Sequence, residues 1–335
     1  MKKLWFSIGF IAAVFLFLIY YIFFVDDPKY LYEAISTVKA VPIILSVLCM
    51  VLYWLFETLA QYFVLKSGES KLSFFKVLRV TMVGQLFNCI TPSASGGQPA
   101  QTYMLVKYGL SVGESACMLL VRFLIYQLVM VVYSVIMLMA KLHYFNSTVT
   151  SFSSLALIGF AVNLIVLALL ILACFFPKFL LKISKKPLYF LEKIKILKNA
   201  EQMYLKIKEE VNKFHQTFKA YKGNLKVSVF PAIFSCLQLT VFLMIPYFII
   251  TGLSVDISFF NAFAAAALIF MISSFVPLPG ASGGAEGVFL LLFSTAFMNS
   301  GKSIAVAILL WRLLTFYLPI ICGSFWLLKL KRKNA

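Results

Sequence analysis

The stretch TPSASGGQPAQ (residues 91–101) decides the fold, because it places two prolines, two glycines and two serines between two apolar runs. The whole chain of 335 residues is 62% hydrophobic and only 13% charged, whereas soluble domains carry about 25% charged residues. It is therefore expected to be a polytopic membrane protein. Irregular backbone at membrane depth must be buried in protein or line a wet cavity, because unsatisfied amides cost several kcal/mol in lipid. The stretch is predicted to form the polar tip of a broken, re-entrant helical hairpin.

A second stretch of the same kind, PLPGASGGAEG (residues 277–287), interrupts another apolar run. The sequence thus predicts an all-α polytopic membrane protein in which six spanning helices accompany two re-entrant broken hairpins, an eight-helix-like bundle. Each spanning run has a length close to the ~20 residues that cross a hydrocarbon core. The six runs cover residues 4–25, 41–65, 113–140, 153–176, 226–250 and 303–328, and the interrupted runs cover 72–90 with 100–106 and 257–276 with 287–298.

The chain also matches itself, which identifies an internal repeat. QYFVLKSGESKLSFF from residue 61 resembles PYFIITGLSVDISFF from residue 246, and PSASGG from residue 92 resembles PGASGG from residue 279. Further on, SACMLLVRFLIYQL and SIAVAILLWRLLTFYL place Arg122 opposite Arg312. Each repeat is predicted to hold a spanning helix, a hairpin with a Ser-Gly-Gly tip, and a second spanning helix with one arginine.

The distribution of basic residues predicts the orientation. Thirteen of the 30 basic residues lie between Lys178 and Lys226. Positively charged loops stay in the cytoplasm, so both termini are expected there, in a bacterial-type plasma membrane. Because one helix and this basic segment separate the repeats, the second is expected to be inverted relative to the first, as in secondary transporters. The segments expected outside keep only Lys29, Lys39, Lys141 and Lys302.

These features divide one integral membrane domain, residues 1–335, into four parts. Residues 1–40 hold the N-terminal helix and an outer loop, and 41–140 hold the first repeat. Residues 141–225 hold a linking helix and a basic segment whose apolar residues recur every three or four positions, as in an amphipathic surface helix. Residues 226–335 hold the second repeat and a basic tail. The basic segment either attracts anionic lipid or merely enforces topology; no direct contact with nucleic acid is expected.

The tips are the candidate binding sites. Their hydroxyl and amide groups can donate hydrogen bonds, and their glycines permit close approach. Pro99 suits the start of a helix whose N-terminus favours an anion. The alternative is that both tips are tight surface turns on ordinary hairpins. The candidate tip residues are Ser93, Ser95, Gly96, Gly97, Gln98, Ser282, Gly283 and Gly284.

Four charged residues in or beside the apolar runs are candidates for the site: Glu57, Arg122, Glu286 and Arg312. A charge at the bilayer centre costs at least ~2.5–3.5 kcal/mol, so each needs a partner or an aqueous cavity. One interpretation is two structural ion pairs, with Glu57 and Glu286 as the carboxylates. The other is that the arginines bind a phosphate bidentately. Both remain open, and we add all four residues to the candidate site.

Neither a metal nor a cofactor is expected. The six cysteines lack C-x-x-C spacing, and the two histidines are far apart in the sequence. Buried cysteines of this kind are ordinarily soft packing residues. No nucleophile constellation with its catalytic partners is recognised in the sequence, so no catalytic residue is proposed.

The paired tips, their spacing and the arginine-bearing helices resemble the transmembrane domain of lysylphosphatidylglycerol synthases, the flippase-like multiple peptide resistance factor family. The resemblance implies movement of an anionic or aminoacylated phospholipid between leaflets, which would alter membrane charge and contribute to resistance to cationic peptides. It supports the tip residues and Glu286 as substrate-binding candidates. Gln98 and Gln101 stand where many relatives have charged residues.

Two functions therefore remain open. The first is a lipid translocase for a phospholipid such as lysylphosphatidylglycerol. The second is a phosphatidylglycerol lysyltransferase, or its membrane subunit. In this family the aminoacyl transfer belongs to a soluble C-terminal domain, whereas here KLKRKNA follows directly after the last apolar run. We expect any soluble aminoacyltransferase to be a separate partner chain.

Overall fold

The computed structural model describes residues 36–68, 70–148, 152–176, 199–221, 223–273, 276–298 and 302–332, with isolated positions 181, 187, 189, 192 and 300. Within these residues the regular elements are helices, and one isolated β-bridge joins two loops. The expected all-α class is confirmed. The spanning helix expected over residues 4–25 lies outside the described residues.

The helices follow the apolar runs closely. The first half of the chain forms α3 (Ala40–Ser67), α4 (Phe74–Ile90), α5 (Gly97–Lys107), α6 (Val112–Thr148) and α7 (Phe152–Phe175). The basic segment contains α9 (Ala200–Tyr221), and after it come α10 (Leu225–Gly252), α11 (Phe259–Ser273), α12 (Gly284–Met298), α13 (Ile304–Arg312), the π-helix η2 (Leu313–Tyr317) and α14 (Leu318–Arg332). The two interrupted runs are thus the helix pairs α4–α5 and α11–α12.

Four of the described helices are long and apolar enough to cross a membrane: Ala40–Ser67, Val112–Lys141, Leu225–Gly252 and Ile304–Lys329. Shorter apolar helices cover Gly159–Leu172, Phe259–Ser273 and Gly284–Met298. A helix needs about 20 apolar residues to span the hydrocarbon core. The chain is therefore a multi-pass membrane protein.

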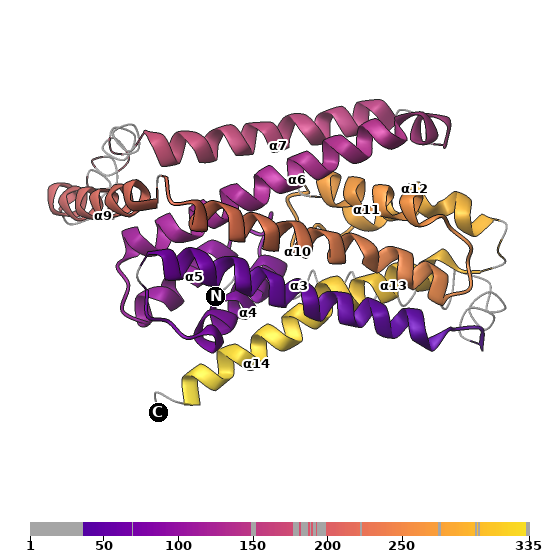
Figure 1. Cartoon of the computed structure of the whole chain (residues 1–335), viewed down its shortest axis with the longest axis horizontal. Coiled ribbons are helices and arrows are strands. Elements are labelled where there is room, and N and C mark those ends of the chain that lie inside the picture. The colour runs from indigo at the N-terminus through magenta and orange to yellow at the C-terminus, as the bar shows by residue number, and fades with distance from the viewer. Residues whose placement is uncertain are drawn as a thin grey trace.

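Helices α3 and α10 form an antiparallel pair along the long axis (Figure 1). The Lys39 amide, at the start of α3, donates a 2.7 Å hydrogen bond to the carbonyl of Gly252, at the end of α10. At the other end the rings of Phe63 and Phe230 stack with centroids 4.9 Å apart. The helices that begin the two predicted repeats, α3 and α10, therefore run in opposite directions.

The two helix pairs occupy opposite halves of the molecule (Figure 1). The α4–α5 pair lies in the half that carries α9, where the Tyr221 hydroxyl donates to the carbonyl of Val64 at 2.8 Å. The α11–α12 pair lies in the other half, where Ser254 donates to the carbonyl of Thr37 at 2.9 Å. The loops that end α4 and α11 consequently meet in the middle of the bundle.

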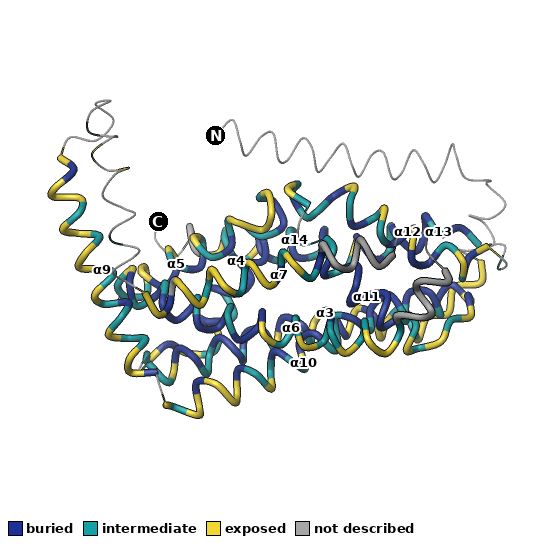
Figure 2. Tube along the Cα trace, turned by 90° about the horizontal axis from the view of Figure 1, so that it is seen from above, coloured by how far each residue is buried: buried dark blue, intermediate teal, exposed yellow. Residues whose placement is uncertain are grey.

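The outward faces of the helices are apolar, and the buried residues follow the inside of the bundle (Figure 2). On the outside, Val41 is 68% exposed and Ile321 is 66% exposed, as suits side chains that contact lipid. On the inside, α11 carries a run of buried alanines, residues 264–267. Small residues let helix backbones approach closely in membranes, which allows α11 to lie deep in the core.

The basic segment contains the amphipathic helix that the sequence predicts. Phe214 and Tyr221 of α9 are buried, and the Glu210 carboxylate accepts a 2.6 Å hydrogen bond from the Gly113 amide in the first turn of α6. On the exposed face the Lys213 ammonium lies 2.8 Å from Glu209 and holds the pKa of that carboxyl below its ordinary value. The helix α9 is therefore attached to the end of the bundle at α3 and α6.

Candidate functional site

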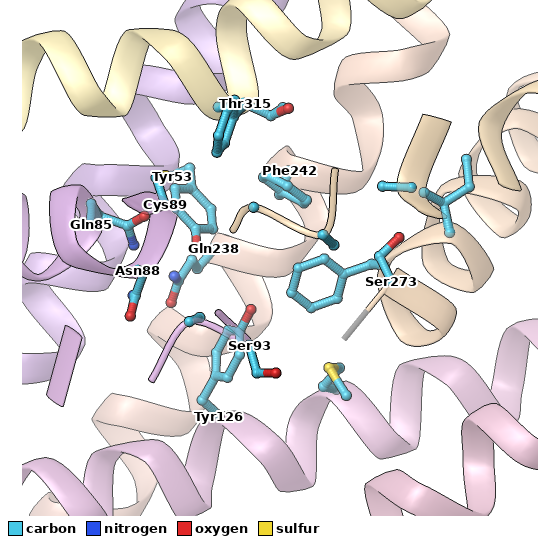
Figure 3. A pocket seen from close by; sticks show the side chains of 18 of the residues that line it. Tyr53, Gln85, Asn88, Cys89, Ser93, Tyr126, Gln238, Phe242, Ser273 and Thr315 are labelled. Atoms are coloured by element: carbon cyan, nitrogen blue, oxygen red, sulfur yellow. The ribbon is translucent and has the colours of Figure 1, made fainter. Parts of the chain in front are cut away.

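A cavity of about 500 Å³ lies where the two tips meet. Its volume falls within the ~300–1,000 Å³ typical of small-molecule sites. Side chains from both halves of the chain point into it (Figure 3). From the first half come Gln85, Asn88 and Ser93, and from the second half come Gln238, Ser273 and Thr315.

The two tips have the same local geometry. Ser95 donates its hydroxyl to the carbonyl of Pro92 at 2.9 Å, and Ser282 donates to the carbonyl of Pro279 at 2.9 Å. The serines therefore close the two turns. Both turns also need two successive left-handed residues, with φ values of 49° and 53° at Ser93 and Ala94 and of 59° and 54° at Gly280 and Ala281. Non-glycine residues rarely adopt this conformation. The two tips therefore share the same uncommon turn conformation.

The tips differ in how they are held. In the first tip the Gly96 amide donates to the Thr91 hydroxyl at 2.8 Å, and Ser95 is exposed. In the second tip the Gly283 amide donates to the Glu286 carboxylate at 2.7 Å, a helix-capping contact from the third residue of α12. Ser282 is 1% exposed. The second tip is thus held by a buried charge, whereas the first is held by a hydroxyl.

The first ion pair connects the two halves of the chain. Arg122 of α6 lies with Nη2 3.7 Å from Oε1 of Glu57 on α3 and donates from Nη2 to Oε1 of Gln238 on α10 at 2.8 Å. Gln85 of α4 donates to the other carboxylate oxygen of Glu57 at 2.5 Å. The Arg122 guanidinium also lies 5.1 Å from the ring centroid of Tyr126. The two amides help to offset the burial of this pair, since one bonds to Glu57 and the other to Arg122.

The second ion pair clamps the second tip. Arg312, the last residue of α13, donates from Nη2 to the Glu286 carboxylate at 2.7 Å and from Nη1 to the carbonyl of Gly280 at 3.0 Å. It also lies over the Trp311 ring, 4.8 Å from the centroid. These contacts hold both sides of the turn, and the π-helix η2 begins immediately after the arginine. π-Helical turns frequently occur at functional sites.

Both arginines keep one unused donor. Among the described residues, Nε of Arg122 and Nε of Arg312 are buried and have no hydrogen-bond partner. A guanidinium has five N–H donors in a fixed fork. Each arginine therefore has one buried N–H group that lacks an acceptor among the residues that the structure describes.

The structure divides the predicted site residues into two groups. Ser93, Gln98, Glu57, Arg122 and Arg312 line the cavity. The others belong to the turns and the clamp behind the lining: Ser95, Gly96, Gly97, Ser282, Gly283, Gly284 and Glu286. Because α5 begins at Gly97, Pro99 lies at the third position of its first turn.

The sequence analysis missed several polar residues that line the cavity. The amides of Gln85 and Gln238 bond directly to the first ion pair. On another side Gln127 donates to Asn163 at 2.8 Å, and each of these two side chains is 4% exposed. Uncharged amides give little signal in an apolar run. Their position inside spanning helices, where polar groups need partners, was the available clue.

The rest of the lining is apolar and aromatic. It includes Met50, Phe123, Phe242, Val162, Val166, Ile269 and Phe270. The cavity thus has polar groups around the ion pairs and tips, and hydrocarbon on its other walls. Such a surface is complementary to an amphipathic molecule.

Comparison with known proteins agrees with this architecture. Residues 5–323 match the family described as the lysylphosphatidylglycerol synthase TM region. A relative from Archaeoglobus fulgidus, described as a UPF0104 membrane protein, is 27% identical over 322 residues, which cover 90% of each chain. The family match extends over nearly the whole chain, both helix pairs and both arginines included. The chain therefore belongs to the family of the lysylphosphatidylglycerol synthase TM region.

Proposed function

We propose that the protein is a lipid translocase that moves a phospholipid headgroup between leaflets through the central cavity. The observation that carries the proposal is the cavity itself, which is bounded by both tips and lined by polar and apolar walls. A headgroup has to leave water to cross the bilayer, so it needs polar partners at the midplane. The tips, the amides and the arginines supply them.

The proposed topology is six spanning helices and two re-entrant hairpins in an inverted repeat, with both termini in the cytoplasm of a plasma membrane. Two observations support it. The helix pairs α4–α5 and α11–α12 occupy opposite halves (Figure 1), and the tips share their turn geometry. In this arrangement the cavity opens alternately to each side while the tips form the barrier, as in transporters with broken helices.

The first headgroup to test is lysylphosphatidylglycerol, which the family's description suggests. The phosphate of any such lipid is the natural ligand for the buried arginines. Each Nε has no partner among the described residues, and a guanidinium binds phosphate oxygens in a planar fork. We propose that Arg122 and Arg312 bind the phosphate in turn as the headgroup passes.

A lysyltransferase role is the second hypothesis, because the family's description names a synthase. It would require lysyl-tRNA, and a partner chain to carry the soluble activity. It predicts formation of lysylphosphatidylglycerol from phosphatidylglycerol when purified protein is incubated with lysyl-tRNA. Lipid movement in vesicles that contain neither tRNA nor ATP favours the translocase.

The test of the proposal uses purified protein in liposomes that carry a trace of lipid with a fluorescent NBD group on one acyl chain. Dithionite bleaches only the outer leaflet, so complete bleaching reports movement between leaflets. We expect complete bleaching with the wild-type protein and much slower bleaching with Arg122→Lys, because an ammonium cannot replace the fork. Arg79→Lys, on α4 and outside the cavity lining, is the matched control. Bleaching that stops at the outer leaflet with the wild-type protein would contradict the proposal.

A further inference from the structure

The cavity holds charges that already cancel. Its charged lining residues are Glu57, Arg122 and Arg312, and Arg312 is bonded to Glu286 at 2.7 Å. Among the described residues the lining contains no lysine or aspartate. Two arginines therefore face two carboxylates. A cationic group that enters the cavity would therefore meet carboxylates that are already paired, in a low-dielectric site where an unpaired charge is costly.

The carboxylates are also poor partners for a new cation. Oε1 of Glu57 faces Arg122 at 3.7 Å, and Oε2 accepts from Gln85 at 2.5 Å. Oε2 of Glu286 accepts from both Arg312 and the Gly283 amide, each at 2.7 Å. An ammonium group entering the cavity would compete with an arginine or a helix cap for these oxygens. The Nε–H groups of both arginines are buried donors without partners among the described residues, and such donors favour acceptor oxygens.

Amide side chains supply the remaining polar lining. Gln85 and Gln238 surround the first ion pair, while Asn88, Gln98 and Gln101 lie beside the first tip. A carboxamide has one acceptor oxygen and two donor hydrogens and carries no charge. A hydroxyl group is likewise both donor and acceptor. A cluster of amides is therefore complementary to a group with several hydroxyls.

The aromatic residues of the cavity fit the same kind of ligand. Tyr53 and Tyr126 also line the cavity (Figure 3), and each offers an apolar ring with a hydroxyl at its edge. Such amphipathic side chains contact the carbon and oxygen atoms of one ligand at once. A glycerol or sugar headgroup has this mixed surface.

We infer that the headgroup selected by this cavity is a polyhydroxylated one without a free amine, such as glycerol or a sugar. The inference rests on the proposed translocation and narrows its substrate. Phosphatidylglycerol and a glycosyl diacylglycerol share this chemistry. They differ in that the first carries a phosphate, which the arginines can bind, and the second carries no charge. Lysylphosphatidylglycerol and phosphatidylethanolamine bring an ammonium group, which would compete with the arginines for the paired carboxylates.

The experiment compares these four lipids with the same acyl-chain NBD label in the liposome assay. We expect phosphatidylglycerol, glucosyl diacylglycerol or both to cross at least about tenfold faster than the two amine lipids. Fast movement of phosphatidylglycerol alone would show that the selected headgroup is a hydroxylated one that also carries a phosphate. Fast movement of both lipids would show that the cavity selects polyhydroxylated headgroups in general. Equal rates for all four lipids would overturn the inference and leave the translocase standing.

The variant Gln98→Leu tests the amides separately from the ion pairs. Gln98 lines the cavity, and loss of one hydrogen bond to a hydroxyl should slow the hydroxylated lipids by about three- to tenfold without changing the amine lipids. Gln202→Leu, at an exposed position of α9, is the matched control. Equal slowing of all four lipids by Gln98→Leu would contradict a role in headgroup selection.

A binding measurement keeps the inference testable if no lipid crosses. Short-chain forms of the same lipids are added to detergent-solubilised protein, and the midpoint of thermal unfolding is recorded, since a bound ligand raises it. We expect a larger rise with short-chain phosphatidylglycerol or glucosyl diacylglycerol than with the lysyl form. If no lipid crosses the bilayer but the hydroxylated lipids raise the unfolding midpoint more, the result would contradict only the proposed translocation. A larger rise with the lysyl form would overturn the inference.

Discussion

Pro92 and Pro279 form an antiparallel β-bridge, so the two tips contact each other directly. The tips belong to helix pairs that come from opposite halves of the bundle (Figure 1). Residues next to the bridge, among them Ser93, Ala94 and Gly280, line the cavity. This contact favours the interpretation of the tips as a central site over their interpretation as surface turns.

The Arg312–Glu286 pair is expected to stabilise the fold, because both side chains are largely buried. Arg312→Gln should destabilise the protein by about 3–5 kcal/mol, since it leaves a buried carboxylate without its partner. The double variant Arg312→Gln with Glu286→Gln should be markedly more stable than the single variant. Thermal unfolding in nanodiscs, followed by tryptophan fluorescence, measures both.

The matched control for that pair is Lys213→Gln on α9. Lys213 bonds to Glu209 and Glu210 in an exposed position, and exposed pairs contribute little to stability. We expect its unfolding midpoint to equal that of the wild type. An Arg312→Gln variant with the same unfolding midpoint as the wild type would show that the Arg312–Glu286 pair does not stabilise the second tip.

The second tip contains two glycines that separate backbone strain from steric clash. Gly283 has φ +84° and no atom near the position of a Cβ, so Gly283→Ala should cost about 1–2 kcal/mol from conformation alone. Gly280 has φ +59°, and a Cβ there would overlap the Phe316 ring of η2. Gly280→Ala should therefore destabilise the protein more and slow lipid movement more. Equal effects of the two substitutions would argue against tight packing of the tip on η2.

Orientation can be tested with single cysteines at the two ends of the bundle. Lys71 lies between α3 and α4, Asp256 lies between α10 and α11, and both are exposed. Lys71→Cys should react with a membrane-impermeant maleimide only from the cytoplasm, and Asp256→Cys only from outside. The parent protein controls for its six free cysteines. Labelling of both positions from the same side would contradict the inverted repeat.

One buried hydrogen bond, from the Tyr221 hydroxyl to the carbonyl of Val64, helps to hold α9 against the bundle. Tyr221→Phe should weaken the attachment by about 1–3 kcal/mol, because the carbonyl is left unsatisfied. Hydrogen exchange of the α9 amides should become faster. Tyr103→Phe, at a position 60% exposed, should leave that exchange unchanged. Unaltered exchange in Tyr221→Phe would show that other contacts hold α9.

Much of the fold was predictable because apolar run length is a strong signal. The runs at residues 41–65 and 226–250 became α3 and α10, and the interrupted runs became two helix pairs. The pairing of each arginine with a carboxylate was one of two open interpretations, and the structure confirms the geometry of both pairs. A buried charge demands a partner, and few candidates exist in an apolar chain.

The parts that were not predictable depend on tertiary contacts. Gln85 and Gln238 look like isolated amides in the sequence, and only the packing of α3, α4, α6 and α10 brings them to the first ion pair. The π-helix after Arg312 has no sequence signal, since it arises from local rearrangement of backbone hydrogen bonds. The division of the tip residues into lining and turn likewise follows from the three-dimensional course of the backbone.

The central claim is that lipid crosses between tips that must separate. Residues paired in an antiparallel bridge have Cα atoms about 4.5–5.5 Å apart, within the ~4.4–6.8 Å that a disulfide spans. The variant with Pro92→Cys and Pro279→Cys can therefore lock the tips together. In the NBD liposome assay we expect oxidation of this variant to stop lipid movement and a reductant to restore it, while either single variant is unaffected by oxidation. Equal rates in the oxidised and reduced double variant, with the disulfide verified by mass spectrometry, would contradict the account.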